Sequence, residues 1–403
     1  MSYLFKSKSS FNDDISNWDV SSVTNMKEMF RGCNDFNQPL NSWNVSSVTN
    51  MAYVFNFTKA FNQPLNNWNV SNVTNMSRMF TSSVFNQPLN SWDVSSVTDV
   101  GGMFQFAQYN QPLDDWDVSK IQFMTYTFRG AAFNQSLNNW NVSSVINMGS
   151  MFLDNDVFNQ PLNNWDVSSV TNMSNMFERA SSFNASLDSW DLSSTETIYK
   201  MFENADAFNH PSVNSWTFTE KLTEVRYVFA ETKTFNQPLD SWNSMPGVSD
   251  MRYMFSGAEA FNQDISNWNV SNVTTMNGMF TNARSFNQPL NSWDVSSVTN
   301  LGSMFYFAFK FNQPLDSWDV SSVENMSWMF HTATSFNQPL ASRWNTSSNY
   351  GWDVSSVKYM PNMFMNATSF NQDIRSWDVS NVISNRFSNM FNGATEMNNN
   401  YFA

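Results

Sequence analysis

The stretch FNQPLNSWNVSSVTNMAYVFNFTKA, Phe36 to Ala60, contains the pattern that decides the fold. The same pattern recurs along the whole chain. Its tryptophan returns every 24 to 26 residues, apart from one interval of 34 between Trp318 and Trp352. A unit this short cannot bury its own apolar face, so it must stack on its neighbours. The sequence therefore predicts a repeat solenoid.

Within the unit, Leu40, Trp43 and Val45 have the L-x-x-L-x-L spacing of a leucine-rich repeat, with tryptophan in the middle apolar position. Because Trp43 and Val45 alternate, they predict a short strand with both side chains turned inward. The next apolar positions, Val48, Met51 and Phe55, are three and four apart, which is typical of a helical or 3₁₀ turn. We expect a right-handed, leucine-rich-repeat-like coil of about fifteen repeats, each with one short parallel strand and one short turn of this kind.

The repeat organises the chain as a single solenoid domain over 1–403. Residues 1–10 and 394–403 are partial units, and about fifteen repeats fill 11–393, with a loop insertion at 342–351. Since the first and last units are partial, three interpretations stay open. The chain is a fragment, its partial units cap the ends, or the ends stack head to tail. The residues expected to form assembly ends are Met1, Phe5, Met397 and Phe402.

Composition excludes several classes of partner. The formal net charge is −14, with 20 Lys and Arg against 34 Asp and Glu, so nucleic acid and anionic membrane surfaces are poor partners. The sequence has no apolar run long enough for a membrane span and no secretory leader. We expect no cofactor, with Ca²⁺ as the one ion to consider.

Two positions of the unit carry structural signals. Asparagine follows the leading aromatic residue in every unit, as at Asn37 and Asn62, and a column of such side chains is expected to hydrogen-bond from coil to coil. A small residue, usually alanine, lies three residues after the second phenylalanine. The single cysteine, Cys33, occupies this position, which predicts a packed thiol without reactivity.

The string FNQPLNSWDVSSVTNLGSMF, Phe286 to Phe305, resembles the repeat of BspA-type bacterial surface proteins, a relative of the leucine-rich repeat. The resemblance covers essentially the whole chain. It implies a solenoid fold and, more loosely, a cell-surface location and adhesion to a host or matrix. It brings no catalytic residues.

The search for catalytic chemistry finds little. The two histidines, His210 and His331, are five repeats apart and are interpreted as tolerated surface substitutions. The sequence lacks a phosphate-binding glycine loop, a nucleophile elbow, a His-Glu-x-x-His motif and paired cysteines. We therefore expect a protein that is not an enzyme.

The strongest polar pattern is the residue between the tryptophan and the first valine, which is Asp or Asn in almost every unit. We expect these side chains to form an outward-facing ladder that either binds a polar ligand or a cation, or only bonds the neighbouring serines and turn amides. Replacement of Asp by Asn favours the second interpretation. The candidate ligand-binding residues of this Asp ladder are Asp93, Asp117, Asp294, Asp319, Asp353 and Asp378.

Irregular segments are the other candidates for binding. The insertion carries Arg343, Trp344 and Tyr350, a composition typical of interface hot spots. The units between Leu192 and Val248 lose the Ser-Ser-Val signature and gain charge, which fits either a recognition segment or simple drift.

Together these features predict a non-enzymatic recognition or adhesion module, extracellular or at a cell surface. It would bind protein or glycan through its strand face and inserted loop. The alternative is a structural protein that assembles end to end into filaments or a surface layer.

Overall fold

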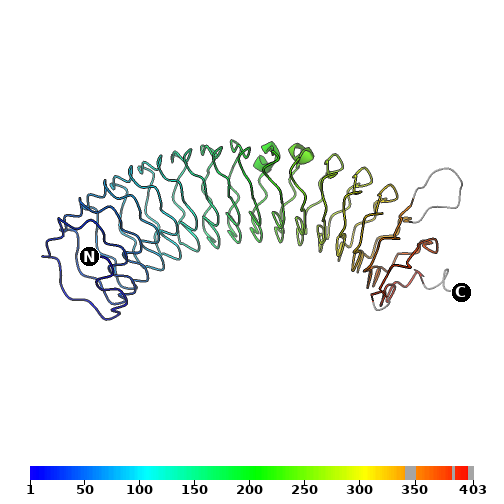
Figure 1. Ribbon diagram of the computed structural model, residues 1–403, viewed down its shortest axis with the longest axis horizontal. Helices are drawn as coiled ribbons and strands as arrows, with labels where there is room; N and C mark the ends of the chain where they lie inside the picture. The colour runs from blue at the N-terminus through cyan, green and yellow to red at the C-terminus, as the bar shows by residue number, and fades with distance from the viewer. Residues whose placement is uncertain (341–350, 384–385, 398–403) are drawn as a thin grey trace. The chain divides into compact units, whose positions relative to one another are not determined.

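The computed structural model describes residues 1–340, 351–383 and 386–397. It divides into two compact units, Met1–Thr195 and Glu196–Ala403. In each unit the chain winds through narrow coils of about one repeat that stack side by side (Figure 1). The repeated coils support a solenoid of leucine-rich-repeat type, and the period runs through both units.

The apolar positions of the repeat form the core. Leu40, Trp43 and Val45 are all buried, as the leucine-rich-repeat spacing predicts. The two phenylalanines of each coil stack on one another, at 4.1 Å between the ring centroids of Phe55 and Phe61. In most coils the tryptophan indole N–H donates to the carbonyl of the apolar residue three positions before the tryptophan of the preceding coil, as Trp68 Nε1 does to Leu40 O at 2.8 Å. The core is therefore built from columns of similar side chains, one from each coil, that pack on their counterparts in the neighbouring coils.

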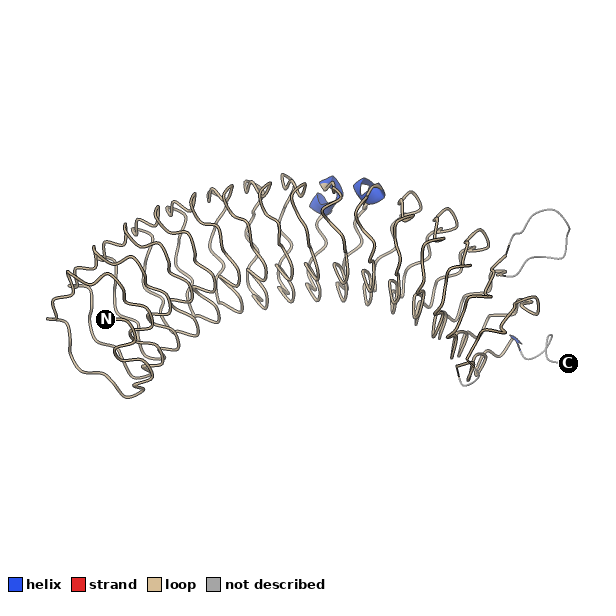
Figure 2. Ribbon diagram, viewed as in Figure 1, coloured by secondary structure: helices blue, strands red, loops and turns tan. Residues whose placement is uncertain are grey.

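The predicted strand and helical turn are not found where the sequence placed them. In the part of the chain that the structure describes, no segment forms a strand, and the helices are the 3₁₀ turns η1 (Pro211–Ser215) and η2 (Asp240–Asn243) (Figure 2). Both lie before or at the tryptophan, where a strand was expected. Coils are instead joined by isolated parallel bridges such as Asn25 to Asn50, seven residues after the tryptophan.

The segment after the bridge residue Asn25 pairs every backbone N–H. In residues 26–33, the N–H groups of Met26, Glu28, Phe30 and Gly32 donate to carbonyls of the next coil at 2.8–3.0 Å. The alternate N–H groups close turns within the coil, as Met29 N does to Met26 O at 3.0 Å. Every donor is used, which is what burial of a backbone between two coils requires.

This pairing forces two residues of each coil into the left-handed region. Each turn closes from residue i to i+3 with a positive φ at i+2, the geometry of a type II turn. In the first coils the i+2 residues are Glu28 (φ 57°), Gly32 (φ 73°), Tyr53 (φ 60°) and Phe57 (φ 58°). Left-handed backbone costs a non-glycine residue roughly 1–2 kcal/mol. The hydrogen bond that its own N–H makes to the next coil offsets this cost.

The predicted asparagine column is confirmed within each unit. The side-chain oxygen of Asn12 accepts the backbone N–H of Asn37 at 2.9 Å, and that of Asn37 accepts from Asn62 at 3.0 Å. The second unit repeats the contact from Asn209 to Asn371. We call this the Asn ladder.

Cys33 is buried, as predicted, and its thiol lies 3.0 Å from the carbonyl oxygen of Phe5. Burial raises the pKa of the Cys33 thiol to about 11, so the reactive thiolate is scarce at neutral pH.

Candidate binding surface on the turn segments

Each coil has two chemically different parts. The outer segment runs from the leading Phe-Asn pair to the second valine, as in 36–48. The turn segment runs from there to the next leading aromatic residue, as in 49–60. Only Lys120, Lys221, Arg343 and Arg375 of the 20 lysines and arginines fall in outer segments, whereas 19 of the 34 Asp and Glu do. The outer segments therefore carry all of the net negative charge, and the turn segments are close to neutral.

The left-handed positions form two rows along the turn segments, which we call the turn rows. The first row holds Tyr3, Glu28, Tyr53, Arg78, Gly102, Tyr126, Ser150 and Asn175, then Lys200, Tyr227, Tyr253, Gly278, Ser303, Trp328, Asn362 and Asn389. The second holds Ser7, Gly32, Phe57, Ser82, Phe106, Gly130, Asp154 and Arg179, then Asn204, Glu231, Gly257, Asn282, Phe307, Thr332, Asn366 and Gly393.

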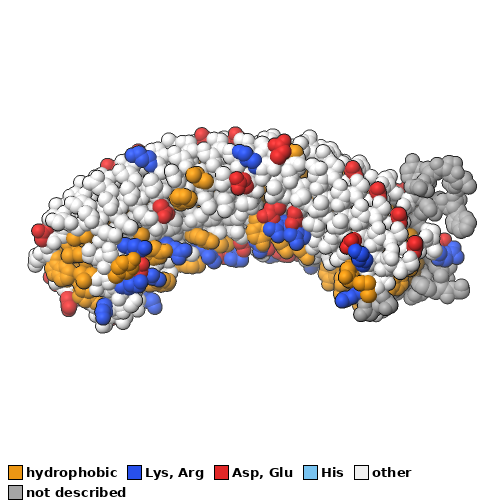
Figure 3. Space-filling model, viewed as in Figure 1, with side chains coloured by type: hydrophobic (Ala, Val, Ile, Leu, Met, Phe, Trp, Pro, Cys, Tyr) orange, Lys and Arg blue, Asp and Glu red, His pale blue; other side chains and the backbone are white. Residues whose placement is uncertain are grey.

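The turn rows carry a variety of side chains that the rest of the surface lacks. Core positions repeat the same residue and outer segments repeat Asn, Asp and Ser, but the turn rows change type from coil to coil. In each unit, hydrophobic and charged side chains gather along one edge, while polar uncharged surface covers much of the rest (Figure 3). A surface whose residues differ at every step can specify a partner.

Bulky residues of the turn rows lean over glycines in the following coil. A Cβ added to Gly130 would lie 2.4 Å from the ring of Phe106, and one added to Gly278 would lie 2.2 Å from the ring of Tyr253. These glycines both accept the left-handed backbone and leave room for the neighbouring aromatic ring. The large side chains are thus fixed in place by the size of the residue one coil on.

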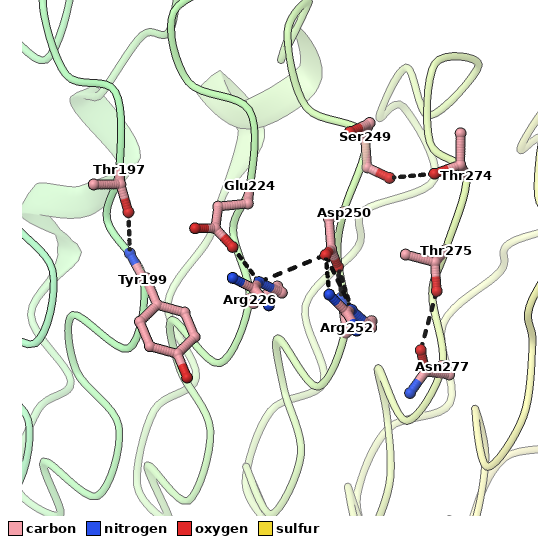
Figure 4. Close-up of polar contacts among 10 residues, drawn as sticks. All are labelled: Thr197, Tyr199, Glu224, Arg226, Ser249, Asp250, Arg252, Thr274, Thr275 and Asn277. Carbon is pink, nitrogen blue, oxygen red and sulfur yellow. Dashed lines mark hydrogen bonds and ion pairs between the residues drawn. The ribbon is translucent and has the colours of Figure 1, made fainter.

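The most charged part of the turn segments lies in the second unit (Figure 4). Arg226 is paired with Glu224 in its own coil and reaches Asp250 in the next at 3.5 Å. Arg252 Nη2 contacts Asp250 at 2.6 Å. In ordinary coils the bridge residue is an asparagine whose oxygen accepts the N–H two residues on, as Asn50 does from Ala52 at 3.0 Å. In this part of the chain Glu224 and Asp250 take the place of that asparagine, and they form ion pairs with Arg226 and Arg252.

Three tyrosines border these ion pairs. The rings of Tyr227 and Tyr253 stack with centroids 4.9 Å apart, and Tyr199 meets Tyr227 edge-on at 6.1 Å. The guanidinium of Arg226 lies 4.9 Å from the Tyr199 ring. Burial, followed by the nearby Tyr253, raises the pKa of the Tyr227 hydroxyl, which therefore stays protonated at neutral pH. We name these tyrosines, with Glu224, Arg226, Asp250 and Arg252, the tyrosine–arginine cluster.

A second group of aromatic residues surrounds His331. Its ring lies 4.8 Å from that of Tyr306 and 5.0 Å from that of Trp328, with Phe307 beside them. His331 is buried, so the expectation of a surface substitution is wrong for it. Burial lowers the pKa of the imidazole, which favours the neutral form. Trp328 is exposed and Tyr306 and Phe307 are half-buried, which leaves an aromatic patch facing solvent.

The first unit carries similar pairs. The Tyr53 ring lies between two arginines, with Arg31 at 5.5 Å and Arg78 at 5.8 Å. Arg129 lies 5.3 Å from the exposed ring of Phe106 and contacts Asp154 at 3.4 Å. Aromatic rings in contact with arginines are thus a recurring feature of the turn rows.

The six predicted Asp residues of the Asp ladder lie on outer segments, and their side chains bond to the serine two residues on. Asp93 Oδ1 accepts the N–H of Ser95 at 3.1 Å, and Asp117 does the same with Ser119 at 3.0 Å. Bonds from the serine hydroxyl and then the serine amide lower the pKa of Asp93 and of Asp117. The equivalent contacts in the second unit are those of Asp294, Asp319, Asp353 and Asp378.

The other predicted site residues divide into two groups. Arg343, Trp344, Tyr350 and Phe402 lie outside the described residues. Met1, Phe5 and Met397 are described. The Met1 amine donates to Asn25 O at 3.2 Å, and the Phe5 ring stacks on Phe11 and Phe30. Met397 is buried.

Within the described residues, no three His, Cys, Asp or Glu side chains are placed to hold a metal ion. The Nδ1 atom of His331 lies 2.9 Å from the hydroxyl of Thr332, and that of His210 accepts the backbone N–H of Ser212 at 3.2 Å. Over the same residues, no helix is long and apolar enough to cross a membrane.

Sequence reasoning missed the turn rows because it assigned these residues to a helical turn. A signal was present. Glycines such as Gly102, Gly130 and Gly278 fall at one of two positions, four residues apart, in the turn segment; they mark left-handed backbone, and the residues around them vary while the rest of the unit repeats. The charged segment between Leu192 and Val248, which the sequence did single out, contains the first half of the tyrosine–arginine cluster.

A family model described as a Mycoplasma protein of unknown function, DUF285, matches the chain at residues 1–113, 105–216, 211–308, 267–351 and 349–403. No curated protein matches it. The narrower resemblance to BspA-type proteins stays a prediction.

Solved structures with some likeness include two bacterial proteins and a plant receptor. A leucine-rich-repeat protein of Leptospira interrogans is 9% identical, with 91% of this chain and 92% of that chain covered and a TM-score of 0.23. An internalin from Listeria monocytogenes is 8% identical, with 87% and 80% covered and a TM-score of 0.17. A plant peptide hormone receptor, in complex with its peptide, is 7% identical, with 89% and 71% covered and a TM-score of 0.17. At TM-scores this low, these likenesses carry no argument about function.

Proposed function

The chain belongs to the DUF285 family of repeat proteins, and from that premise we propose that it is a non-enzymatic recognition protein. Its turn rows bind a protein or glycan partner. The observation that carries the proposal is the confinement of varied side chains to these rows, on a chain whose other surface repeats the same polar residues. Repeat solenoids commonly bind partners along such a surface.

The composition of the turn rows fits this role. Tyrosine, tryptophan and arginine contribute most of the binding energy at protein interfaces, since each offers a large contact area with a polar end. Tyr253 and Trp328 of the turn rows, with Arg226 on a neighbouring turn-segment position, offer such groups within a few coils of the second unit. Because these side chains are held by neighbouring rings and ion pairs, little freedom is lost when a partner binds.

Three finer expectations from the sequence are kept as part of this proposal. The coil is right-handed with about fifteen repeats, the chain is a relative of BspA-type surface proteins, and it works outside the cell or at its surface. The Asp ladder and the inserted loop at 342–351 stay a second candidate surface. Ca²⁺ is the ion that the Asp ladder would take, because its ligands would all be oxygen atoms.

The first test is binding of the whole chain to an immobilised glycan library and to immobilised extracellular-matrix proteins. Once a ligand is found, Tyr253→Ser and Trp328→Ser are each expected to weaken binding at least tenfold, since hot-spot residues cost 2 kcal/mol or more and a factor of ten is about 1.4 kcal/mol. The matched control is Asp294→Asn with Asp319→Asn, on the outer segments.

Two outcomes contradict this assignment. If the Asp variants abolish binding while the turn-row variants retain it, the Asp ladder is the site, and chelation of Ca²⁺ then shows whether the ion takes part. Absence of binding to both libraries counts against a recognition role altogether.

A further inference from the structure

The coils between Asp35 and Asp93 differ in charge from the rest of the chain. Residues 36–92 contain no Asp or Glu, and their charged side chains are Lys59 and Arg78. This is the longest stretch without an acidic residue in a chain that has 34 Asp and Glu. An anionic ligand that approaches these coils therefore meets local positive charge, although the net charge of the whole chain is −14.

The coil before this stretch adds to the positive charge. Arg31 Nη1 lies 2.8 Å from Glu28, and Lys6 contacts the same carboxylate at 2.6 Å, so two basic side chains share one acid. The ring of Tyr53 lies between two guanidinium groups, with Arg31 at 5.5 Å and Arg78 at 5.8 Å. The group of side chains around Tyr53 therefore keeps a net positive charge.

The Arg78 guanidinium is available to a ligand. Arg78 is exposed, and among the described residues its guanidinium has neither an acidic partner nor a hydrogen bond. Its backbone is fixed, because its N–H donates to Gly101 O at 2.8 Å in the next coil. Gly102 leaves room for the side chain, since a Cβ there would lie 3.0 Å from Arg78 Cγ. Stacking on Tyr53 leaves the in-plane N–H groups free, and this fork can bind a carboxylate or a sulfate through two parallel hydrogen bonds.

Exposed aromatic rings lie on the second turn row in the coils on either side of Arg78. Phe57 is 46% exposed and Phe106 is 44% exposed, with Ser82 at the position between them. Lys59 lies two residues after Phe57, is exposed, and has no ion pair within the described part of the chain. Figure 3 shows hydrophobic and basic side chains beside one another over the first coils. One coil advances the surface by about 4.8 Å, close to the length of one sugar residue in an extended polysaccharide.

We propose that the turn rows of these coils bind an acidic polysaccharide. The residues of this surface, which we call the basic aromatic surface, are Arg31, Tyr53, Phe57, Lys59, Arg78 and Phe106. The apolar C–H faces of the sugar rings stack on Phe57 and Phe106, and the carboxylate or sulfate groups bind Arg78 and Lys59. The inference rests on the proposed recognition by the turn rows, and it names the ligand class of the part in the first unit.

The basic aromatic surface fits an acidic glycan better than it fits other polyanions. Nucleic acids and anionic membranes are held by many basic side chains at once, whereas this surface offers Arg31, Lys59 and Arg78. An acidic peptide supplies negative charge but no regular row of flat apolar faces. A polysaccharide with anionic groups along a chain of sugar rings matches both the exposed phenylalanines and the arginine fork.

The first experiment measures binding of the whole chain, in EDTA, to three immobilised polysaccharides. Heparin carries sulfate and carboxylate groups, polygalacturonate carries carboxylates alone, and dextran is neutral. Binding to one or both acidic polysaccharides and not to dextran is expected, and polygalacturonate separates the two sources of charge. EDTA removes Ca²⁺, so the Asp ladder cannot contribute through that ion. Binding to neither acidic polysaccharide, or equal binding to dextran, overturns the proposal. Equal affinity for polyglutamate overturns the assignment to a glycan.

Substitutions then locate the site on the acidic polysaccharide that binds. Arg78→Gln and Phe57→Ser are each expected to weaken binding about tenfold. Arg78→Lys should recover only part of that loss, because lysine cannot form the two parallel bonds. Lys120→Gln and Ile146→Ser are the matched controls, since both residues are exposed in the first unit and lie off the turn rows. Circular dichroism checks that the variants fold. Equal losses in the controls contradict the proposal, as does full binding by Arg78→Gln and Phe57→Ser.

The same variants separate a failure of this inference from a failure of the proposed function. If no acidic polysaccharide binds but Tyr253→Ser weakens binding of another ligand, this inference alone is wrong. If Tyr253→Ser, Arg78→Gln and Phe57→Ser all leave the binding of every ligand unchanged, the turn rows are not the binding surface and both are wrong.

Discussion

At the scale of single residues, stability comes from side chains that satisfy the neighbouring coil as well as filling the core. Trp165 is 1% exposed and its indole N–H donates to Leu137 O at 2.8 Å. Phe177, Phe183 and their equivalents have a packing role but no such hydrogen bond to offer. Where the indole N–H makes this bond, the tryptophan links burial to hydrogen bonding between successive coils.

We predict that Trp165→Ala lowers the free energy of unfolding by about 3–5 kcal/mol, the usual cost of truncating a buried aromatic residue. The loss has two sources, the cavity and the carbonyl of Leu137 left without that donor. Urea denaturation measures it. A conservative Trp165→Phe variant keeps most of the packing and should lose less, so equal losses would contradict the part assigned to packing.

At the scale of the turn segment, coil-to-coil hydrogen bonds override local preference. Ser303 has φ 57° because its N–H must donate to Ser327 O at 2.8 Å. Serine disfavours this region by roughly 1–2 kcal/mol, whereas glycine enters it freely and costs about 0.5–1 kcal/mol in unfolded-chain entropy. The balance favours glycine.

We therefore predict that Ser303→Gly raises the free energy of unfolding by about 0.5–1 kcal/mol, by the difference of those two terms. The reverse substitution at an equivalent position, Gly278→Ser, should destabilise, since its φ is +67° and its Cβ would meet the Tyr253 ring at 2.2 Å. Denaturant unfolding with unchanged slope tests both. Destabilisation by Ser303→Gly would show that the left-handed backbone is not strained there.

At the scale of the whole chain, the carboxylates of the outer segments contribute to the response to pH. Serine hydroxyl and amide bonds lower the pKa of Asp93, Asp117 and Asp353 below the model-compound value of 3.8. A lowered pKa in the folded state means that the ionised form stabilises the fold. This contribution is fully present above pH 3.8 and is lost as the pH falls through the lower folded values.

We predict that the free energy of unfolding falls as the pH is lowered from about 4 to about 2. Replacing Asp93, Asp117 and Asp353 by Asn provides the control. Asn keeps the oxygen acceptor, as Asn44 does toward Ser46 at 3.2 Å, but does not titrate. The triple variant should lose less stability over this pH interval, as measured by chemical denaturation. An unchanged slope would mean that other carboxylates control the acid response.

The sequence by itself determined the period, the buried columns and the Asn ladder. These features repeat at one position per coil, so stacking brings identical residues such as Asn12 and Asn37 together whatever path the backbone takes between them. Only the tertiary structure decided where the coils bond. Local spacing pointed to a strand at Trp43 and a helical turn after Val48, but N–H groups such as those of Glu28 and Tyr53 find their acceptors in the next coil. That long-range pairing imposes left-handed turns that local preference disfavours, and it places the varied side chains on the turn rows.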